Sequence, residues 1–262
     1  MTNVTQVTCI RAVPKHRRLL CGSRKFKVFQ YQRPFIPDVS DDNAICCAKF
    51  SDKNFEIYVA GERSVKIWDA KTGKPVRVLK NVFNDSKVNS TELQSITHME
   101  FDEDHRKLII GSTNGQVKIF DLLSGIETHA LDPHSSDAAI SFIGYGGYDY
   151  TIITAAWDRT VKVHMDERLE HKEPFEMVKR GKLNCHTRDL ICGDYSHKLG
   201  LIATGGRDNR VNIWEYEKIQ LVNAIEAHDT EVSLVRFLSP LPLLLTSDIS
   251  GQLYIWIVKP HP

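Results

Sequence analysis

Histidine, cysteine and carboxylate side chains could do chemistry in this chain, but their spacing argues against catalysis and metal binding. None of the eleven histidines falls in an H-E-x-x-H or Cys/His ligand spacing. The nearest cluster, Cys185, His186 and Cys192, could hold zinc, although structural roles explain these residues better. No G-x-S-x-G nucleophile elbow occurs. We therefore expect no metal, no cofactor and no enzymatic activity.

Two other patterns suggest chemistry only at first sight. Asp158 and Asp208 could form a carboxylate pair, but each lies in a polar turn, where a structural hydrogen bond is the simpler role. The glycine-rich run 144–147 has neither a P-loop lysine and serine after it nor a predicted helix that could receive a phosphate. We expect this run to be a loop between two strands.

The elements that carry these residues repeat six times. Each repeat has a short apolar strand, small residues, a polar turn and an alternating strand, and the closing residues are Phe29, Trp68, Phe120, His164, Trp214 and Trp256. Their mean spacing is about 45 residues. The period-two patterns between turn residues predict four short antiparallel strands per repeat, here called a to d in chain order. One such unit cannot bury both of its apolar faces, so neighbouring units must cover one another.

This repeat resembles the WD40-repeat β-propeller family. In that family a histidine before strand a, a serine or threonine on strand b, an aspartate in the b–c turn and a tryptophan on strand c form a hydrogen-bonded tetrad. The resemblance implies one complete tetrad, made of His186, Thr204, Asp208 and Trp214. It implies one partial set of His134, Thr154 and Asp158, with His164 in the tryptophan position. It implies a second of His228, Thr246 and Trp256, with Ser250 where aspartate is expected.

We therefore predict an all-β WD40 propeller of about six four-stranded blades. The predicted repeats are residues 8–36, 45–80, 96–131, 138–178, 186–225 and 228–262, in a single propeller covering 1–262. The last blade lacks its outer strand unless residues 1–7 or missing sequence completes it. Closure by the N-terminus and membership in a longer, multi-propeller protein both remain open, because an open ring would expose strand edges.

The longest interval between closing residues runs from Trp68 to Phe120, and its extra residues lie in the segment 84–94. An exposed loop is the simplest interpretation, because such connections tolerate insertion at little cost. A partner-binding loop is one alternative. A gene-model artefact is another, because residues 88–94 can be deleted without disturbing the flanking strand patterns.

Composition limits the possible partners. The chain has 34 basic and 33 acidic residues and a formal net charge of +1, so no overall field favours nucleic acid or anionic lipid. The N-terminus lacks the pattern of a secretory signal, and the most apolar run, 238–245, is too short to span a bilayer. The six cysteines form no CxxC pair. We expect a cytoplasmic protein without nucleic-acid, membrane or small-molecule partners.

A narrower resemblance concerns function. The stretches AAWDRTVKVHMDE, HTRDLICGDYSHKLGLIATGGRDNRVNIWEYE and VSLVRFLSPLPLLLTSDISGQLYIW resemble large WD-repeat proteins of cilia and flagella, some of which carry EF-hands. The resemblance implies a non-catalytic scaffold of the ciliary axoneme whose partners are axonemal or microtubule-associated proteins. No EF-hand loop occurs here, so any calcium role would come from a missing region. The alternative is a soluble adaptor that recognises a peptide or degron on its top face.

Turns are where such a fold usually meets its partners, because the strand ladders hold variable loops in place. The candidate partner-binding residues in the b–c turns are Arg63, Asn114, Trp157, Arg159, Arg207 and Arg210. Trp157 and Arg159 are the strongest candidates, because an aromatic residue and an arginine are typical binding anchors. Alternatively, Trp157 simply covers an adjacent blade.

Overall fold

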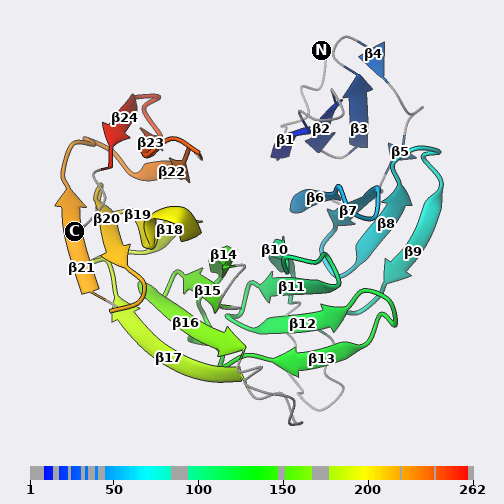
Figure 1. Cartoon of the computed structure of the whole chain (residues 1–262), viewed down its shortest axis with the longest axis horizontal. Helices are drawn as coiled ribbons and strands as arrows, with labels where there is room; N and C mark the ends of the chain where they lie inside the picture. Colours follow the sequence, from blue (N-terminus) through cyan, green and yellow to red (C-terminus); the bar gives the residue numbers. More distant parts are fainter. Residues whose placement is uncertain are drawn as a thin grey trace.

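The computed structural model describes residues 9–13, 18–22, 25–30, 33–34, 39–40, 45–83, 94–146, 151–166, 177–218, 220–238 and 240–258. Within these ranges the chain forms six antiparallel sheets, which lie side by side around an arc (Figure 1). The all-β fold class is confirmed. No described segment forms a helix of the length and apolarity needed to cross a membrane.

Each sheet is a contiguous stretch of chain. The first contains β1 (Cys9–Val13), β2 (Arg18–Gly22), β3 (Lys25–Gln30), β4 (Arg33–Pro34) and β5 (Val39–Ser40). The second contains β6 (Cys47–Ser51), β7 (Glu56–Ala60), β8 (Val65–Asp69) and β9 (Pro75–Leu79). The third contains β10 (Ile96–Phe101), β11 (Lys107–Ser112), β12 (Val117–Asp121) and β13 (Glu127–Ala130).

The remaining three sheets follow the same order. The fourth contains β14 (Ile140–Gly146), β15 (Thr151–Ala156), β16 (Thr160–Asp166) and β17 (Met177–Asn184). The fifth contains β18 (Leu190–Ser196), β19 (Leu201–Gly206), β20 (Val211–Glu215) and β21 (Gln220–Ile225), with a 3₁₀ turn at His197–Leu199. The sixth contains β22 (Val232–Phe237), β23 (Leu243–Asp248) and β24 (Leu253–Ile257).

The core lies between neighbouring sheets. Val65 and Ile67 of β8, for example, are fully buried against Ile96 and Leu108 of the third sheet. The same contact recurs between the third and fourth, fourth and fifth, and fifth and sixth sheets. In the third, fourth and fifth sheets the alternating side chains therefore serve two interfaces, one on each face of the sheet.

Small residues on strand b let the sheets approach. A Cβ added at Gly205 would lie 2.6 Å from Cγ1 of Val232, and one at Gly111 would lie 2.7 Å from Cγ2 of Ile140. In both cases the neighbour is on the first strand of the next sheet. A side chain at either glycine would therefore force the two sheets apart.

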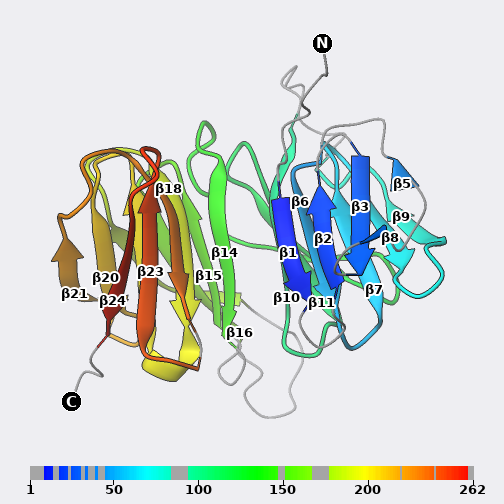
Figure 2. The same ribbon diagram turned by 90° about the horizontal axis from the view of Figure 1, so that it is seen from above.

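The arc is open between its ends. Figure 1 shows the first sheet and the sixth sheet on either side of the opening, and Figure 2 looks into it. The sixth sheet has three strands in the described part of the chain, as predicted for the last blade. Residues 1–7 lie outside the described residues, so completion of this sheet by them stays a prediction.

Two other expectations concern loops. The run 144–147 was expected to be a loop, which is wrong for its first three residues, because Gly144 to Gly146 pair with β15 as the end of β14. Both strands that flank the surplus after Trp68 form where predicted, as β9 and β10. Residues 84–93 themselves lie outside the described residues.

Candidate protein-binding surface

A buried histidine anchors the b–c turn of the fifth sheet. His186 Nδ1 lies 2.8 Å from Asp208 Oδ1, and His186 Nε2 lies 2.9 Å from Thr204 Oγ1. The indole Nε1–H of Trp214 donates to the same Thr204 oxygen at 3.1 Å. The structure thus brings together all four residues that the resemblance implies. Strands b and c, the turn between them and the segment before strand a are joined by buried polar groups that satisfy one another.

The fourth sheet has a related set. His134 Nδ1 lies 3.1 Å from Asp158 Oδ1, and His134 Nε2 lies 2.9 Å from Thr154 Oγ1. Thr160 Oγ1 donates to Asp158 Oδ1 at 2.7 Å. His164 takes the tryptophan position and is buried. A hydroxyl in the turn therefore adds a hydrogen bond to the aspartate of this sheet.

The sixth sheet supplies its carboxylate from an unexpected position. Ser250 stands at the turn position where an aspartate is expected, but the set keeps a carboxylate, because Asp248 Oδ2 lies 3.1 Å from His228 Nδ1 and Ser250 Oγ donates to Asp248 Oδ1 at 2.6 Å. His228 Nε2 and Trp256 Nε1 both lie 2.9 Å from Thr246 Oγ1. This sheet therefore also holds a histidine, threonine, aspartate and tryptophan together.

Comparison with Gly206 explains how the aspartate can come from a different sequence position in the sixth sheet. Gly206 ends β19 as Asp248 ends β23, and a Cβ there would lie 2.6 Å from His186 Nδ1 and 2.7 Å from Asp208 Oδ1. A side chain at the last position of strand b would therefore occupy the space that the carboxylate of the turn aspartate fills. Glycine at that position admits an aspartate from the turn, whereas Asp248 fills the place itself.

The three aspartates are held ionised. Burial alone would raise the pKa of Asp158, but hydrogen bonds from His134 and Thr160 hold it well below its usual range. Burial likewise opposes ionisation of Asp208, but the Thr187 backbone N–H and His186 lower its pKa. The Ser250 hydroxyl, followed by His228, lowers the pKa of Asp248 to about 2. Burial lowers the pKa of His186, so its ring is neutral at pH 7 and donates from Nδ1 to Asp208.

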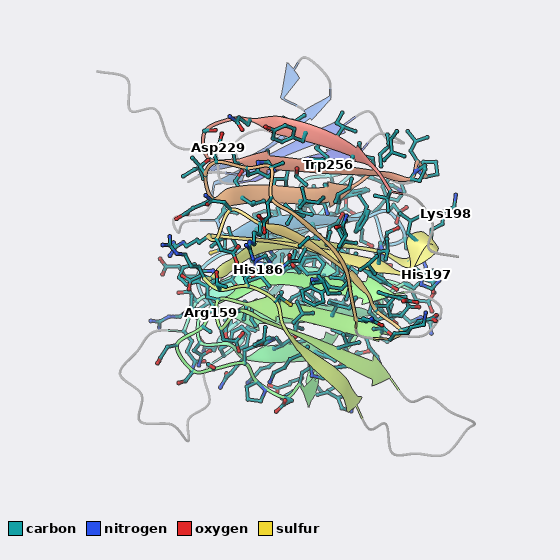
Figure 3. All side chains as sticks on the ribbon, turned by 90° about the vertical axis from the view of Figure 1, so that its left-hand side faces the viewer. Arg159, His186, His197, Lys198, Asp229 and Trp256 are labelled. Carbon is teal, nitrogen blue, oxygen red and sulfur yellow. The ribbon has the colours of Figure 1, made fainter. Side chains whose placement is uncertain are left out.

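We call the surface formed by the b–c turns 61–64, 113–116, 157–160 and 207–210 the b–c rim. Figure 3 shows Arg159 on the same side of the molecule as His186 and Asp229, and opposite His197 and Lys198. Arg159 and Asn209 hold corresponding turn positions with φ of 68° and 64°. Asp158 accepts a hydrogen bond from the Thr160 backbone N–H, and Asp208 accepts one from the Arg210 backbone N–H. These two bonds fix the turns. The rim is thus shaped by the buried sets beneath it.

Trp157 and Arg207 contact each other on the rim. The Arg207 guanidinium carbon lies 5.5 Å from the centroid of the Trp157 ring, and the Trp157 residue is still 42% exposed. Arg207 Nη1 lies 2.9 Å from Asp189 Oδ2, and Arg207 Nε lies 3.5 Å from Glu231 Oε2. One arginine therefore links the fourth, fifth and sixth sheets, and Trp157 is partly covered by a neighbouring blade while offering an exposed aromatic face.

The other candidates lie apart from this pair. Arg210 forms an ion pair with Glu226 at 2.7 Å. Asn114 Oδ1 accepts a hydrogen bond from Ser112 Oγ at 2.5 Å, and the Arg63 carbonyl accepts one from the Val82 backbone N–H. None of these contacts reaches Trp157. The structure brings together Trp157 and Arg207 and does not bring Arg63 or Asn114 to them.

Sequence reasoning missed the acidic residues of the d–a loops. Asp189 and Glu231 each stand directly before strand a of their sheet, and both pair with Arg207. An acidic residue at the same place in two successive repeats was the signal. Arg188 was also missed, and it helps to line a hollow of about 370 Å³ with Thr187 and the turn 207–210.

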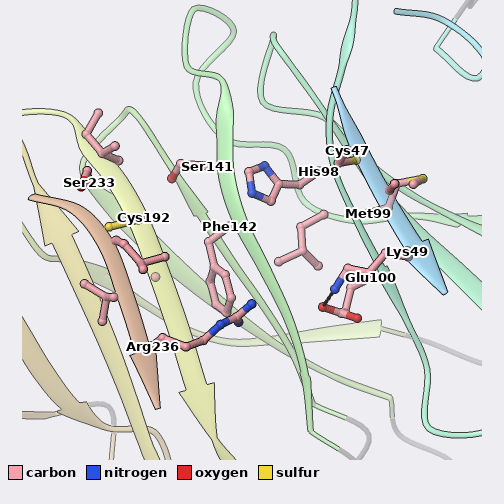
Figure 4. Close-up of a pocket in the computed structure, with 16 residues that line it drawn as sticks. Cys47, Lys49, His98, Met99, Glu100, Ser141, Phe142, Cys192, Ser233 and Arg236 are labelled. Atoms are coloured by element: carbon pink, nitrogen blue, oxygen red, sulfur yellow. Dashed lines mark hydrogen bonds and ion pairs between the residues drawn. The ribbon is translucent and has the colours of Figure 1, made fainter. Parts of the chain in front are cut away.

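A second hollow of about 400 Å³ lies among the first strands of sheets two to six (Figure 4). Its charged groups are paired, Lys49 with Glu100 at 2.5 Å and Arg236 with Asp194 at 3.0 Å. Burial lowers the pKa of His98 in its wall to about 4, so this ring is neutral at pH 7. No group of three histidine, cysteine, aspartate or glutamate side chains suited to a metal occurs among the described residues. This hollow therefore offers little uncompensated charge.

Radially packed antiparallel sheets with histidine, threonine, aspartate and tryptophan fixing their turns define a WD40-repeat β-propeller. The chain belongs to the β-propeller family described as "Nucleolar protein 10-like, N-terminal domain", whose family model matches residues 29–186. The model of the WD domain, G-beta repeat, matches residues 177–215. Members of the WD40 class are generally non-catalytic interaction scaffolds.

Similar proteins span several functions. Cilia- and flagella-associated protein 337 B of Tetrahymena thermophila is 28% identical over 96% of this chain and 19% of its own length. Anaphase-promoting complex subunit cdc20 of Dictyostelium discoideum is 22% identical over 79% of this chain and 37% of its own length. A chain in the crystal structure of the mitotic checkpoint complex superposes with a TM-score of 0.65 at 20% identity, over 80% of this chain and 59% of that one, which shows a common fold. This chain thus spans well under half of either curated relative.

Proposed function

We propose that this chain is a protein-interaction scaffold that binds its partner through the b–c rim, with Trp157 and Arg159 as anchors. The observation that carries the proposal is the exposed face of Trp157, held in place by Arg207. Large aromatic side chains and arginines supply most of the energy at protein interfaces.

Rigidity of the rim supports this role. Asp158 and Asp208 tie their turns to buried histidines, so the side chains of the rim start from a fixed backbone. A surface that is ordered before binding loses less conformational entropy when the partner arrives. The rim therefore meets a requirement of a scaffold, which is to present the same surface to its partner at all times.

We further propose that the scaffold works in the ciliary axoneme, as one propeller of a longer protein, and that its partners are axonemal or microtubule-associated proteins. Support comes from the similarity to the Tetrahymena ciliary protein, which extends over 96% of this chain. That relative continues well beyond the matched segment, because the match covers 19% of it.

Extraction of isolated cilia tests the location. An axonemal scaffold stays with the microtubules after detergent removes the membrane and leaves only with high salt, because salt screens the polar contacts of an interface. Complete release by detergent alone would end the axonemal proposal while leaving a soluble scaffold possible.

The alternative is an adaptor that recognises a peptide or degron, favoured by the similarity to the cdc20 subunit of the anaphase-promoting complex. Recognition of an acidic peptide needs convergent positive charge. Arg207 and Arg210 on the rim, and Lys49 and Arg236 in the central hollow, are instead paired with carboxylates. Titration with an acidic peptide separates the two functions, because an adaptor would bind it and a scaffold for a structured partner would not.

A further inference from the structure

The b–c turn of the sixth sheet exposes a large apolar residue, Ile249, at the position that Trp157 holds in the fourth sheet. This position directly follows the last residue of strand b, and it is Arg207 in the fifth sheet. The second and third sheets carry Gly61 and Thr113 there. Ile249 is 66% exposed, more than Trp157. The turn of Ile249 therefore continues the b–c rim onto the sixth sheet with an apolar side chain.

The same backbone hydrogen bond fixes Trp157 and Ile249 in their turns. The Trp157 N–H donates to the Ala139 carbonyl at 3.0 Å, and the Ile249 N–H donates to the Glu231 carbonyl at 3.0 Å. In both sheets the acceptor is the residue directly before strand a. The Arg207 N–H makes the equivalent bond in the fifth sheet at 2.9 Å. The three side chains therefore start from equivalent backbone positions at the same end of their sheets.

Contacts join these three positions into one row. Arg207 covers part of the Trp157 ring, with its guanidinium carbon 5.5 Å from the ring centroid. Arg207 Nε also lies 3.5 Å from Oε2 of Glu231, whose carbonyl holds the backbone of Ile249. We call Trp157, Arg207 and Ile249 the anchor row. This row crosses three neighbouring sheets and has an apolar side chain at each end.

The charge at the centre of the anchor row is already balanced. Arg207 Nη1 lies 2.9 Å from Asp189 Oδ2, and Glu231 lies beside the same guanidinium. Two carboxylates thus face one cation, so a further acidic group from a partner would be repelled there. Arg207 Nη2 forms no hydrogen bond with any described residue, so it can donate to an uncharged oxygen of a partner.

Trp157 shows that this turn position stays open when a further sheet lies beside it. The fifth sheet packs against the fourth, and Arg207 covers part of the Trp157 ring. Trp157 nevertheless remains exposed. The exposure of Ile249 is therefore a property of its turn position as well as of its place at the end of the arc.

We propose that the partner-binding surface continues past the b–c rim to Ile249, and that the partner presents two apolar side chains to the anchor row, one to Trp157 and one to Ile249. An uncharged hydrogen-bond acceptor of the partner lies between them and meets Arg207. Apolar anchors around a polar contact are the pattern of an interface between folded proteins. An acidic peptide does not fit this pattern. The inference rests on the proposed function and adds Ile249 and the chemistry of the partner to it.

Co-sedimentation with salt-washed axonemes tests the inference. Ile249→Ala removes the second anchor, and Ile249→Lys replaces it with a positive charge. Ile126→Ala is the matched control, since Ile126 is also 66% exposed and lies in the β12–β13 turn, at the other end of strand c. Thermal unfolding checks the fold of each variant. Ile249→Thr, which keeps the branched shape, replaces the alanine variant if alanine lowers the Tm by more than a few degrees.

We expect Ile249→Ala to bind about tenfold more weakly and Ile126→Ala to bind normally, because the loss of an anchor matters only inside the interface. Ile249→Lys should bind at least as weakly as Ile249→Ala, because a charge buried against an apolar surface stays unpaired. Normal binding by Ile249→Ala would overturn the inference. Stronger binding by Ile249→Lys would also overturn it, because the partner would then be acidic at this point.

Trp157→Ala, measured in the same series, separates failure of this inference from failure of the proposed function. Weak binding by Trp157→Ala together with normal binding by Ile249→Ala would keep the b–c rim as the binding surface and end that surface before the sixth sheet. Normal binding by both variants would overturn the proposed function as well. Absence of binding by the unsubstituted chain would overturn the inference together with the axonemal proposal.

Discussion

Arg207 of the fifth sheet covers part of the Trp157 ring of the fourth, with its guanidinium carbon 5.5 Å from the ring centroid. The cation–π contact itself contributes about 0.5–1 kcal/mol at an exposed site. The contact has a larger effect on the orientation of the Trp157 ring, because Arg207 is itself held by ion pairs with Asp189 and Glu231. The exposed face of Trp157 is thereby presented in one orientation.

Replacing Trp157 with alanine should weaken binding and leave the fold intact. We expect a loss of about 2 kcal/mol in binding free energy, roughly thirtyfold in affinity, because aromatic anchors at interface centres have effects of this size. Co-sedimentation of the purified variant with salt-washed axonemes measures the affinity. Leu123→Ala, another exposed residue, serves as the control and should bind normally. A fall in Tm of more than a few degrees would show that Trp157 is mainly structural.

Arg159→Gly separates the role of the side chain from that of the backbone. Arg159 has a φ of 68°, a left-handed conformation that costs a residue with a Cβ about 1 kcal/mol and costs glycine little. We therefore expect a free energy of unfolding within about 1 kcal/mol of the original chain, together with weakened axoneme binding. Asn209→Gly, with a φ of 64°, is the matched control for the backbone. Undiminished binding by Arg159→Gly would remove Arg159 from the binding surface.

Thr204→Val should destabilise the fifth sheet strongly. The Thr204 hydroxyl lies 2.9 Å from His186 Nε2 and 3.1 Å from Trp214 Nε1, so valine leaves both buried nitrogens without it. The expected cost is about 2–4 kcal/mol in urea unfolding. Thr151→Val is the control of equal shape, because Thr151 is fully buried and its hydroxyl has no hydrogen-bond partner in the described structure. Similar costs for both variants would refute the role given to the Thr204 hydroxyl.

Stability should fall as the pH drops from about 6.5 to 4. Burial lowers the pKa of His98 to about 4 and also lowers that of His186, so in this window the unfolded chain binds protons that the folded chain does not. Burial raises the pKa of Asp194, which acts in the opposite direction. Urea unfolding between pH 7.5 and 4 measures the slope, and His98→Leu should flatten it. An unchanged slope in this variant would rule out the contribution of His98.

Much of this structure could be predicted from sequence, because the repeat dictates strand alternation and turn chemistry together. The Thr204 set was recoverable because its four residues stand at regular offsets within one repeat. Asp248 was missed for a physical reason. In its repeat Asp248 stands two residues earlier than Asp208 does in the fifth repeat, yet its carboxylate contacts the equivalent histidine. The structure shows why, because a side chain at Gly206, the position equivalent to Asp248, would overlap the carboxylate of Asp208.

The rim was only partly predictable. Trp157 and Arg207 were identified as turn residues, but their contact joins different repeats and depends on how neighbouring sheets pack. The pairing of Arg207 with Glu231 likewise depends on how the fifth and sixth sheets pack. The glycines of residues 144–146 were assigned to a loop because glycine is common in turns, whereas here they continue a strand.

Oxidation of Trp157 by hydroxyl radicals within intact axonemes tests the binding surface most directly. The rate of oxidation depends on how much of the side chain solvent can reach, and the Trp157 residue is 42% exposed in the chain alone. The proposal predicts that Trp157 is oxidised several times more slowly in axonemes than in the purified chain, while exposed residues far from the b–c rim, such as Leu123, change little. Equal oxidation of Trp157 in the two samples would contradict the assignment of the b–c rim as the partner-binding surface.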